Sequence, residues 1–314
     1  MAFWILGAAV ACAILLVGGF MAYVLTRYMP IIVNIFEEGQ ILPPPPSGAR
    51  LAGEAVDFTA TDGTPLHGIF LKGEGGNGKT VVFCHEYGSD MHSLQKYGAA
   101  LTRHGFCVFA FDFRGHGASA ETNGYVPRQW VTDKEVKDTL GAIDYLKTRP
   151  DVDASNLGIF GVSRGAGSSI CTADRCPDIK AILADSAFST ELTLEKYMKK
   201  WVSIYASVRI IYKNLPNFFY ATLGFLCRRA AQRRLKCSFP SVERAARRLA
   251  PRPLYMIYGE KDNYVGLNQA KDLFGCAGEP KALWVVPGAR HNESAVVAGD
   301  EYAEKVSEFF EQSL

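Results

Sequence analysis

The sequence has no excess of charge of one sign, and this absence excludes several classes of protein. Its 314 residues include 34 Lys and Arg against 32 Asp and Glu, which leaves a formal net charge of +2. A globally basic nucleic-acid-binding protein would carry a much larger positive charge. The composition, with 48% hydrophobic and 21% charged residues, also excludes an intrinsically disordered chain. The length is sufficient for one large or two small domains with a substantial buried core.

The sequence also lacks the Cys and His spacings that are typical of metal sites. Eight cysteines include one CxxxxC pair, Cys171 and Cys176, but no second pair of Cys or His lies near it, so no zinc site is expected there. Residues 85–89 begin like the zinc-protease motif HExxH, yet Ser89 stands where the second histidine ligand is required. We therefore expect neither a metal nor a metal-dependent mechanism.

Charged side chains are also absent from residues 1–25. At about 1.5 Å per helical residue this run can cross a hydrocarbon core of roughly 30 Å, which predicts one transmembrane helix. A cleaved signal peptide is the alternative. Against it, the segment has no Lys or Arg near its start, its apolar run is long for a signal peptide, and no clear small-x-small cleavage site follows that run. Arg27, the nearest basic residue, favours a single-pass protein whose body lies on the cytoplasmic side.

Composition then divides the chain into an anchor at residues 1–28, a linker at 29–50 and a body at 51–314. The linker contains LPPPPS at 42–47, for which a polyproline II spacer is expected. In the body, short β-rich runs alternate with longer helical patterns, which predicts a mostly parallel sheet with helices on both faces. The predicted strands are 55–61, 66–72, 80–84, 107–111, 157–161, 179–184, 254–258 and 282–286, and the predicted helices are 92–104, 131–147, one from 164, 267–274 and 293–310.

A serine lies in a GxSxG sequence directly after one of these strands. Gly161, Ser163 and Gly165 form this pattern, and a helix start rich in small residues follows it. The glycines permit a sharp strand-to-helix turn that lifts the Ser163 hydroxyl out of the sheet, near a helix N-terminus. Ser163 is therefore the candidate nucleophile.

A serine hydroxyl is a weak nucleophile, so it needs a histidine as general base and an acid to orient that histidine. His291 follows the strand at 282–286, and Asp262 follows the strand at 254–258. The order Ser163, Asp262, His291 is that of nucleophile-elbow hydrolases. The alternative interpretation makes Asp262 a turn or N-cap residue and His291 a surface loop residue.

Two backbone amides are candidates for stabilising an oxyanion. The first belongs to Arg164, the residue after the nucleophile, and the second to Tyr87, in the HEYG segment after the strand at 80–84. Asp185 and Ser186, after the strand at 179–184, offer an alternative acid and an alternative nucleophile, although Ser186 lacks the flanking glycines.

These motifs, together with DFRGHGAS at 112–119, resemble the α/β-hydrolase superfamily, and specifically membrane-anchored serine hydrolases related to the serine aminopeptidase and monoacylglycerol lipase groups. The resemblance covers residues 55–310, without most of an insert at about 188–252. It implies an α/β-hydrolase fold with an inserted helical cap and an N-terminal transmembrane helix. It also implies that Asp112, Arg114 and His116 hold the loop below the nucleophile, and Asp112 can pair locally with Arg114.

One position departs from this resemblance. The family commonly has HGxG at the oxyanion site, whereas the second position here is Glu86. A carboxylate beside that site opposes developing negative charge unless it points away or is paired.

The insert carries the charge asymmetry that the net value conceals. Residues 188–252 hold 14 Lys and Arg against 3 Asp and Glu, a net of +11, and the rest of the chain holds 20 against 29, a net of −9. Apolar residues at spacings of three and four predict helices with one apolar face, and the arginines face either solvent or lipid phosphate. These apolar residues are Trp201, Ile204, Tyr205, Val208, Ile211, Tyr212, Phe218, Phe219, Tyr220, Leu223, Phe225 and Leu226.

Together these features predict a membrane-anchored serine hydrolase that cleaves an ester or thioester of a lipid-like acyl substrate through an acyl-enzyme. The catalytic residues would be Ser163, His291 and Asp262, with Tyr87 and Arg164 as oxyanion donors, and no cofactor is required. One alternative is a peptidase on the same fold, for which Glu86 could bind a peptide N-terminus. The other is a non-catalytic membrane-bound binding protein. A nucleic-acid partner is not expected, because the sheet lacks the aromatic signature that stacks bases.

Overall fold

The computed structural model describes residues 2–37, 50–76, 78–120, 124–205 and 215–314. The chain forms two compact units. We call Gly39–Lys196 with Cys237–Leu314 the sheet unit, and Met1–Glu38 with Tyr197–Lys236 the helical unit.

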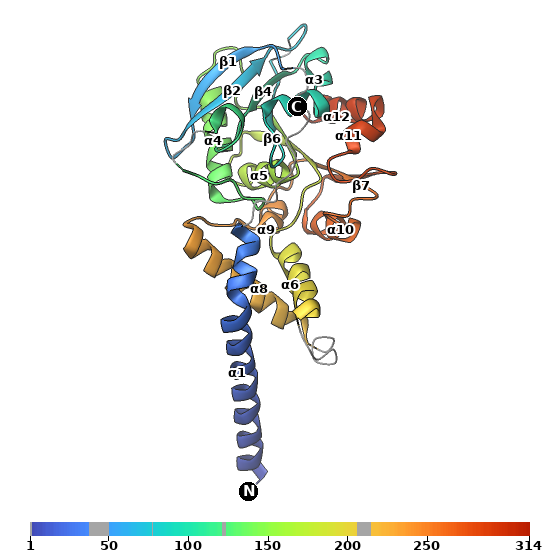
Figure 1. Cartoon of the computed structure of the whole chain (residues 1–314). Coiled ribbons are helices and arrows are strands. Elements are labelled where there is room, and N and C mark those ends of the chain that lie inside the picture. The colour runs from blue at the N-terminus through green and yellow to red at the C-terminus, as the bar shows by residue number, and fades with distance from the viewer. Residues whose placement is uncertain (1, 38–49, 77, 121–123, 206–214) are drawn as a thin grey trace. The chain divides into compact units, whose positions relative to one another are not determined.

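The sheet unit is built on an eight-stranded sheet with the order β1-β2-β4-β3-β5-β6-β7-β8 (Figure 1). Strand β2 runs antiparallel to β1 and β4, and all other neighbouring pairs are parallel, which confirms the predicted mostly parallel sheet. Central strands are continuous apolar runs because helices cover both faces of a parallel sheet. The strands are β1 Glu54–Thr59, β2 Pro65–Leu71, β3 Thr80–Cys84, β4 Cys107–Phe111, β5 Leu157–Val162, β6 Ile179–Asp185, β7 Leu254–Gly259 and β8 Lys281–Val286.

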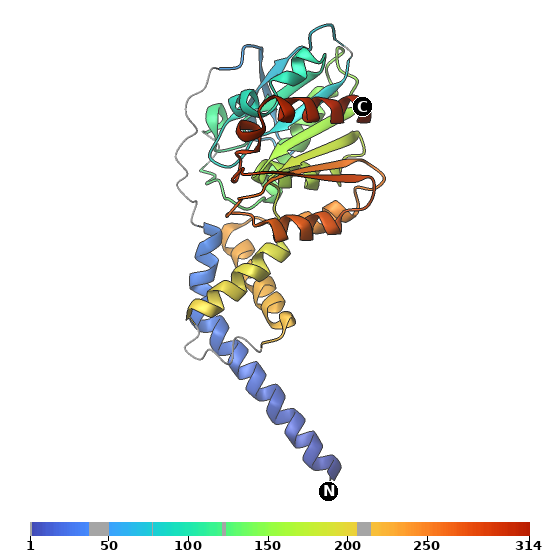
Figure 2. The ribbon, with the colours of Figure 1, turned by 90° about the vertical axis from the view of Figure 1, so that its right-hand side faces the viewer.

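Helices cover the sheet on both sides. One side carries α2 (Leu94–Tyr97), α3 (Ala100–Arg103), α11 (Ser294–Ala298) and α12 (Asp300–Ser313), and Figure 2 shows α12 in dark red in front of the strands. On the other side, α4 (Asp133–Leu146) contacts α5 (Arg164–Ala173), α9 (Val242–Arg247) packs on α5, and α10 (Leu267–Cys276) packs on α9. This layered arrangement is the one that the sequence pattern predicts.

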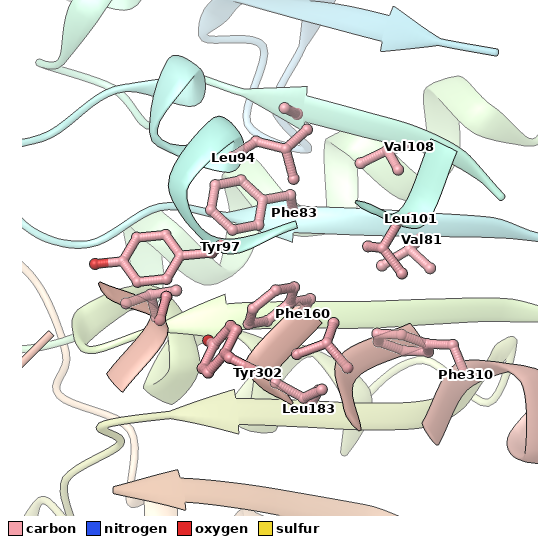
Figure 3. Close-up of a cluster of buried hydrophobic side chains, with 14 of the residues drawn as sticks. Val81, Phe83, Leu94, Tyr97, Leu101, Val108, Phe160, Leu183, Tyr302 and Phe310 are labelled. Carbon is pink, nitrogen blue, oxygen red and sulfur yellow. The ribbon is translucent and has the colours of Figure 1, made fainter. Parts of the chain in front are cut away.

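Aromatic side chains fill the core on the α12 side of the sheet (Figure 3). Phe83 and Phe160 meet edge to face with ring centroids 5.4 Å apart, and Phe106 meets Phe310 of α12 at 6.2 Å. All four are fully buried. Tyr97 also lies in this core, at the end of α2.

Two helices that the sequence predicts as continuous are interrupted in the structure. The helix predicted at 92–104 is a 3₁₀ turn, Met91–Ser93, followed by the short helices α2 and α3, with Gly98 ending α2. The helix predicted at 293–310 is divided into α11 and α12 at Gly299, whose φ of +52° is incompatible with a continuous right-handed helix.

The helical unit contains α1 (Ala2–Glu37), α8 (Asn217–Leu235) and the end of α6 (Glu191–Tyr205). Helix α1 continues past residue 28, where the sequence places the end of the anchor, and includes Pro30. Its segment Phe3–Ile31, with a mean hydropathy of 2.4, is long and apolar enough to cross a membrane, a property that a signal sequence near the N-terminus can share. The predicted polyproline spacer at 42–47 lies outside the described residues, as do Val208, Ile211 and Tyr212 of the insert.

The described residues of the insert between β6 and β7 form the helices α6, α8 and α9, and the insert is divided between the two units. Residues 197–236 group with α1, whereas residues 188–196 and 237–252, including α9, belong to the sheet unit.

Phe160 provides a test of the core packing. Phe160→Ala should lower the free energy of unfolding by about 3–5 kcal/mol, because it removes a fully buried ring and leaves a cavity against Phe83. Val296→Ala, at a side chain that is 67% exposed, should change it by less than about 0.5 kcal/mol. Urea denaturation of the detergent-solubilised chain measures both. Equal effects of the two substitutions would contradict the described core.

Candidate active site

Ser163 lies at the turn between β5 and α5. Its φ of +51° and ψ of −114° fall in a region that non-glycine residues rarely occupy, so the backbone here is strained. The Ser163 amide donates to the Asp185 carbonyl at 2.7 Å, which ties the turn to the end of β6. This is the strand-to-helix turn that the GxSxG sequence predicts.

The two glycines beside Ser163 are required by close backbone approaches. A Cβ on Gly161 would lie 2.4 Å from both the Gly165 carbonyl oxygen and Ser169 Oγ. A Cβ on Gly165 would lie 2.1 Å from the Cys84 carbonyl oxygen and 2.5 Å from that of His85. The start of α5 therefore packs directly on the end of β3, which no larger residue would permit.

His291 and Asp262 lie in line with Ser163. Ser163 Oγ and His291 Nε2 are 2.9 Å apart, and His291 Nδ1 is 2.7 Å from Asp262 Oδ2. The other carboxylate oxygen of Asp262 accepts the amides of Tyr264 and Val265, both at 2.8 Å. With Nδ1 donating to this fixed carboxylate, Nε2 is the nitrogen that can accept the Ser163 hydroxyl proton.

Tyr264 is a neighbour of the histidine that sequence reasoning missed. Its ring stacks on the His291 ring at a centroid distance of 5.1 Å and an interplanar angle of 29°. Gln129 donates a hydrogen bond to the Tyr264 hydroxyl. The only signal in the sequence is its position two residues after Asp262. Stacking on one ring face restricts how the imidazole can tilt.

The candidate oxyanion donors lie at the start of α5 and after β3. Arg164 is the first residue of α5, so no carbonyl within the helix accepts from its amide. Tyr87 follows the end of β3, which is the strand that Gly165 contacts. In the described ranges, no backbone carbonyl accepts from either amide. Both donors are therefore available to a ligand.

The side chain of Arg164 has a role that the sequence did not indicate. It is fully buried, donates to the Arg128 carbonyl at 3.0 Å and lies 3.5 Å from the Glu135 carboxylate. Its guanidinium group is also 5.2 Å from the ring centroid of Tyr87 and 5.3 Å from that of Phe113. Arg164 thus contacts the loop that carries Tyr87, the other candidate oxyanion donor.

Two buried histidines serve as fixed hydrogen-bonding groups. His85 Nε2 accepts the Phe113 amide at 3.1 Å, so its Nδ1 donates to the Glu86 carbonyl at 2.7 Å. His116 Nε2 is 3.3 Å from an Arg164 nitrogen. Burial, and then the charge of Arg164, lowers the pKa of His85 to about 3 and also lowers that of His116. Both imidazoles are therefore neutral near pH 7.

The carboxyl group of Glu86 is directed to partners on the segment that follows it. Ser93 Oγ donates to one carboxyl oxygen at 3.0 Å, and the Tyr97 hydroxyl donates to the other at 3.3 Å. The side chain is buried, and burial raises the pKa of Glu86, which favours the neutral acid. The orientation of the carboxyl group toward Ser93 and Tyr97 and its raised pKa both weaken the repulsion between Glu86 and an oxyanion.

The DFRGHGAS turn is held by contacts other than the predicted local pair. Asp112 accepts the amides of Met91 and Ala118, each at 2.6 Å, instead of pairing with Arg114. Arg114 binds Asp138 of α4, with its Nε at 2.8 Å, and also Asp62 at 2.9 Å. The local pairing was wrong because short-range amide donors satisfy Asp112 first, which leaves Arg114 for more distant carboxylates.

Asp185 and Ser186 form a separate buried cluster. Asp185 accepts from the Tyr302 hydroxyl at 2.7 Å and from Ser186 Oγ at 2.8 Å. The structure therefore places Asp262, and not Asp185, at the Nδ1 atom of His291. The described residues contain no group of three or more His, Cys, Asp or Glu that could hold a metal ion.

Comparisons with known proteins identify the family and the fold of this chain. A family model described as serine aminopeptidase, S33, matches residues 76–293. The uncharacterised protein YfhR of Escherichia coli K12 is 28% identical over 310 residues, which cover 96% of this chain and 94% of YfhR. Thiohydrolase aneE of Aspergillus aculeatus is 31% identical over 117 residues, or 37% of this chain and 35% of that protein. The esterase Pf2001 of Pyrococcus furiosus, 23% identical, superposes with a TM-score of 0.62 over 88% of this chain and 99% of its own, which shows the same fold.

Asp185 yields a prediction for the pH dependence of stability. Burial raises its pKa from 3.8 to about 6, so between these values the folded state keeps a proton that the unfolded state releases. The free energy of unfolding therefore falls as pH rises through this window. Asp185→Asn has no titrating carboxyl group at this position, so this pH-dependent decrease in stability disappears. Relative to the parent, the variant should gain roughly 2–3 kcal/mol between pH 4 and pH 7.

Urea denaturation at both pH values measures this gain. Asp144→Asn, at an exposed carboxylate of α4, is the matched control for the loss of one acidic group. A stability difference between Asp185→Asn and the parent that stays the same at pH 4 and pH 7 would contradict a raised pKa.

Proposed function

The chain belongs to the serine aminopeptidase family, S33, of α/β hydrolases, and on this premise we propose that Ser163, His291 and Asp262 act together as a catalytic triad. The observation that carries the proposal is the hydrogen-bonded series from Ser163 Oγ to His291 Nε2, at 2.9 Å, and from His291 Nδ1 to Asp262, at 2.7 Å. A nucleophile, a base and an orienting acid in contact are what acyl transfer requires.

In the proposed reaction, Ser163 Oγ attacks the substrate carbonyl carbon while its proton moves to His291 Nε2. Asp262 stabilises the resulting imidazolium through Nδ1. The former carbonyl oxygen becomes an oxyanion, which the amides of Tyr87 and Arg164 stabilise. Collapse of this intermediate breaks the bond to the leaving group, which receives the proton from His291 and leaves an acyl group on Ser163. Water, deprotonated by His291, then attacks the acyl carbon. The bond to Ser163 Oγ breaks, the carboxylic acid is released, and His291 returns the proton to Oγ.

The positive end of α5 supports this assignment. Ser163 is the N-cap of this helix, where the unpaired amides and the helix dipole favour negative charge. Burial raises the pKa of Glu86, which reduces the negative charge that would oppose it. The site thus concentrates donors where charge develops during the reaction.

A carboxylic ester or thioester with an apolar acyl group is the proposed substrate class. The thiohydrolase relative supports a thioester as one member of this class. No cofactor takes part in this chemistry.

We further propose that α1 anchors the protein in a membrane as a single span, with the sheet unit on the cytoplasmic side. Its segment Phe3–Ile31 has the length and hydropathy of a span, and Arg27 lies near its C-terminal end. Such an anchor would keep the enzyme close to lipid-like substrates.

A fluorophosphonate probe tests the triad. It should label the parent protein on Ser163, because only an activated serine attacks the phosphorus centre. Ser163→Ala should abolish labelling, and His291→Ala should slow it by about 10²–10⁴-fold through loss of the general base. Ser186→Ala, at the buried serine that donates to Asp185, is the matched control and should label like the parent.

Normal folding of the parent without any labelling would refute the mechanism and favour the non-catalytic binding protein. Circular dichroism of each variant separates loss of reactivity from loss of fold.

A peptidase is the second candidate function, because the matching family model is that of serine aminopeptidases. Glu86, the residue that could bind a peptide N-terminus, is buried and bonded to Ser93 and Tyr97, which disfavours this role.

A panel of p-nitrophenyl esters and aminoacyl-p-nitroanilides distinguishes the two functions. We expect kcat/KM for the esters to exceed that for the anilides, and to rise with acyl length. Faster cleavage of the anilides, lost in Glu86→Gln, would instead assign the peptidase function.

A further inference from the structure

Helix α8 has an outward face that changes character along its length. A buried stripe at Phe219, Leu223, Cys227 and Ala231 marks its inner face. On the opposite face, Phe218 and Phe225 are 67% and 51% exposed, respectively. Exposed aromatic rings at one end of a helix indicate a partner surface that is apolar there.

The second half of the outward face is cationic. Arg229 and Arg233 continue the outward row after Phe225 at intervals of four residues, and both are exposed. Between Asn217 and Cys227 the sequence has no Lys, Arg, Asp or Glu, whereas Arg228, Arg229, Arg233, Arg234 and Lys236 follow within ten residues. At about 1.5 Å per residue, the helix passes from apolar to cationic within roughly 6 Å.

The inner face of α8 sets its position along α1 (Figure 1). Phe219 stacks on Phe20 with ring centroids 5.8 Å apart and planes at 27°. Toward the other end of α8, Ala230 and Arg234 line a cleft of about 420 Å³ with five α1 residues, the first Leu25 and the last Val33. The two helices therefore run in the same direction, with the aromatic end of α8 beside Phe20 and its arginines beside the end of the apolar segment.

Phe20 lies inside Phe3–Ile31, the segment of α1 that has the length of a membrane span. If that segment crosses a bilayer, Phe219 and the neighbouring Phe218 must lie near the depth of Phe20, because contacting rings share a depth. The arginines, beside residues 25–33, then lie at the depth of the lipid headgroups. Apolar side chains in hydrocarbon and guanidinium groups at phosphates are the arrangement that a membrane–water boundary favours.

We propose that the outward face of α8 docks on the lipid bilayer, with Phe218 and Phe225 in the acyl-chain region and Arg229 and Arg233 on anionic headgroups. The helix thereby forms a second, partly inserted membrane contact beside α1. This proposal rests on the membrane span assigned to α1 under the proposed function, but not on the catalytic triad.

The partner chemistry is that of an anionic phospholipid in a bilayer. Guanidinium groups bind phosphate oxygens in a bidentate manner, and a negative surface potential attracts clustered basic residues. The cleft between α1 and α8 fits the same partner, since its lining is mostly apolar and includes Arg234. Water-soluble anions would satisfy the arginines but not the exposed phenylalanines.

Site-specific photo-crosslinking tests this contact in the full-length chain, reconstituted in nanodiscs of phosphatidylcholine and phosphatidylglycerol. p-Benzoylphenylalanine replaces Phe218, Phe225, Leu15 or Val296, one position at a time. Leu15, 75% exposed on α1, reports the span, and Val296, 67% exposed on α11 of the sheet unit, reports background. We expect lipid adducts at positions 218 and 225 at a yield near that at 15 and at least tenfold above that at 296.

One outcome is that lipid adducts form at position 15 but the yields at 218 and 225 are no higher than at 296. This outcome would overturn the docking of α8 and leave the membrane span of α1 intact. Background yields at all four positions would overturn both the span and the docking. Fluorophosphonate labelling of the same samples reports the catalytic assignment separately, because the two results can fail independently.

A separate measurement tests whether Arg229 and Arg233 bind anionic headgroups. Mass spectrometry of the lipids crosslinked at position 225 should show phosphatidylglycerol enriched at least twofold over its bulk share. The double variant Arg229→Gln and Arg233→Gln should return it to the bulk share. Arg103→Gln with Arg175→Gln, which removes two exposed charges from the sheet unit, should preserve the enrichment. Unchanged enrichment in the α8 variant would refute headgroup binding by these arginines.

Discussion

The close approach of Gly165 to the end of β3 is the constraint on which the candidate site depends. With the Cβ position of Gly165 only 2.1 Å from the Cys84 carbonyl oxygen, α5 begins directly against that strand. This contact leaves the chain a single sharp turn in which to pass from β5 to α5, and Ser163 takes the strained conformation at its apex. The same contact brings the amide of Arg164 and the loop of Tyr87 to adjacent strand ends. The positions of the proposed nucleophile and of the proposed oxyanion donors thus follow from one packing requirement.

Buried charge stabilises the loops around this turn. The guanidinium group of Arg164 lies between the rings of Tyr87 and Phe113, and Arg114 ties the neighbouring turn to Asp138. An isolated buried cation would be costly, so each arginine has a carboxylate within reach. Neutral His85 and His116 add hydrogen bonds without further charge.

Much of this arrangement could be predicted from the sequence, because it follows from local patterns. All eight strands were predicted to within two residues, since buried strands are continuous apolar runs bounded by turn residues. Ser163, Asp262 and His291 could be nominated because each follows the end of a predicted strand. The breaks at Gly98 and Gly299 were missed, because glycine within a helical pattern is compatible with either a break or a continuous helix.

Other features depend on contacts between segments far apart in the sequence. The stacking of Tyr264 on His291, the burial of the Arg164 side chain and the partners of Arg114 have no local signature. The insert at about 188–252 was predicted as a helical cap of the hydrolase domain, and its residues 197–236 group with α1. The charge asymmetry was visible in the sequence, but its distribution along the outward face of α8 required the helix boundaries and the burial of each residue.

The most direct test of the central claim is to trap the acyl-enzyme. The protein is mixed with a p-nitrophenyl ester, quenched in acid within the first turnovers, digested and analysed by mass spectrometry. We expect the mass of the acyl group on the peptide that contains Ser163, with fragmentation assigning it to that serine. Ester hydrolysis with an unmodified Ser163 peptide, or with the acyl group on another residue, would contradict it.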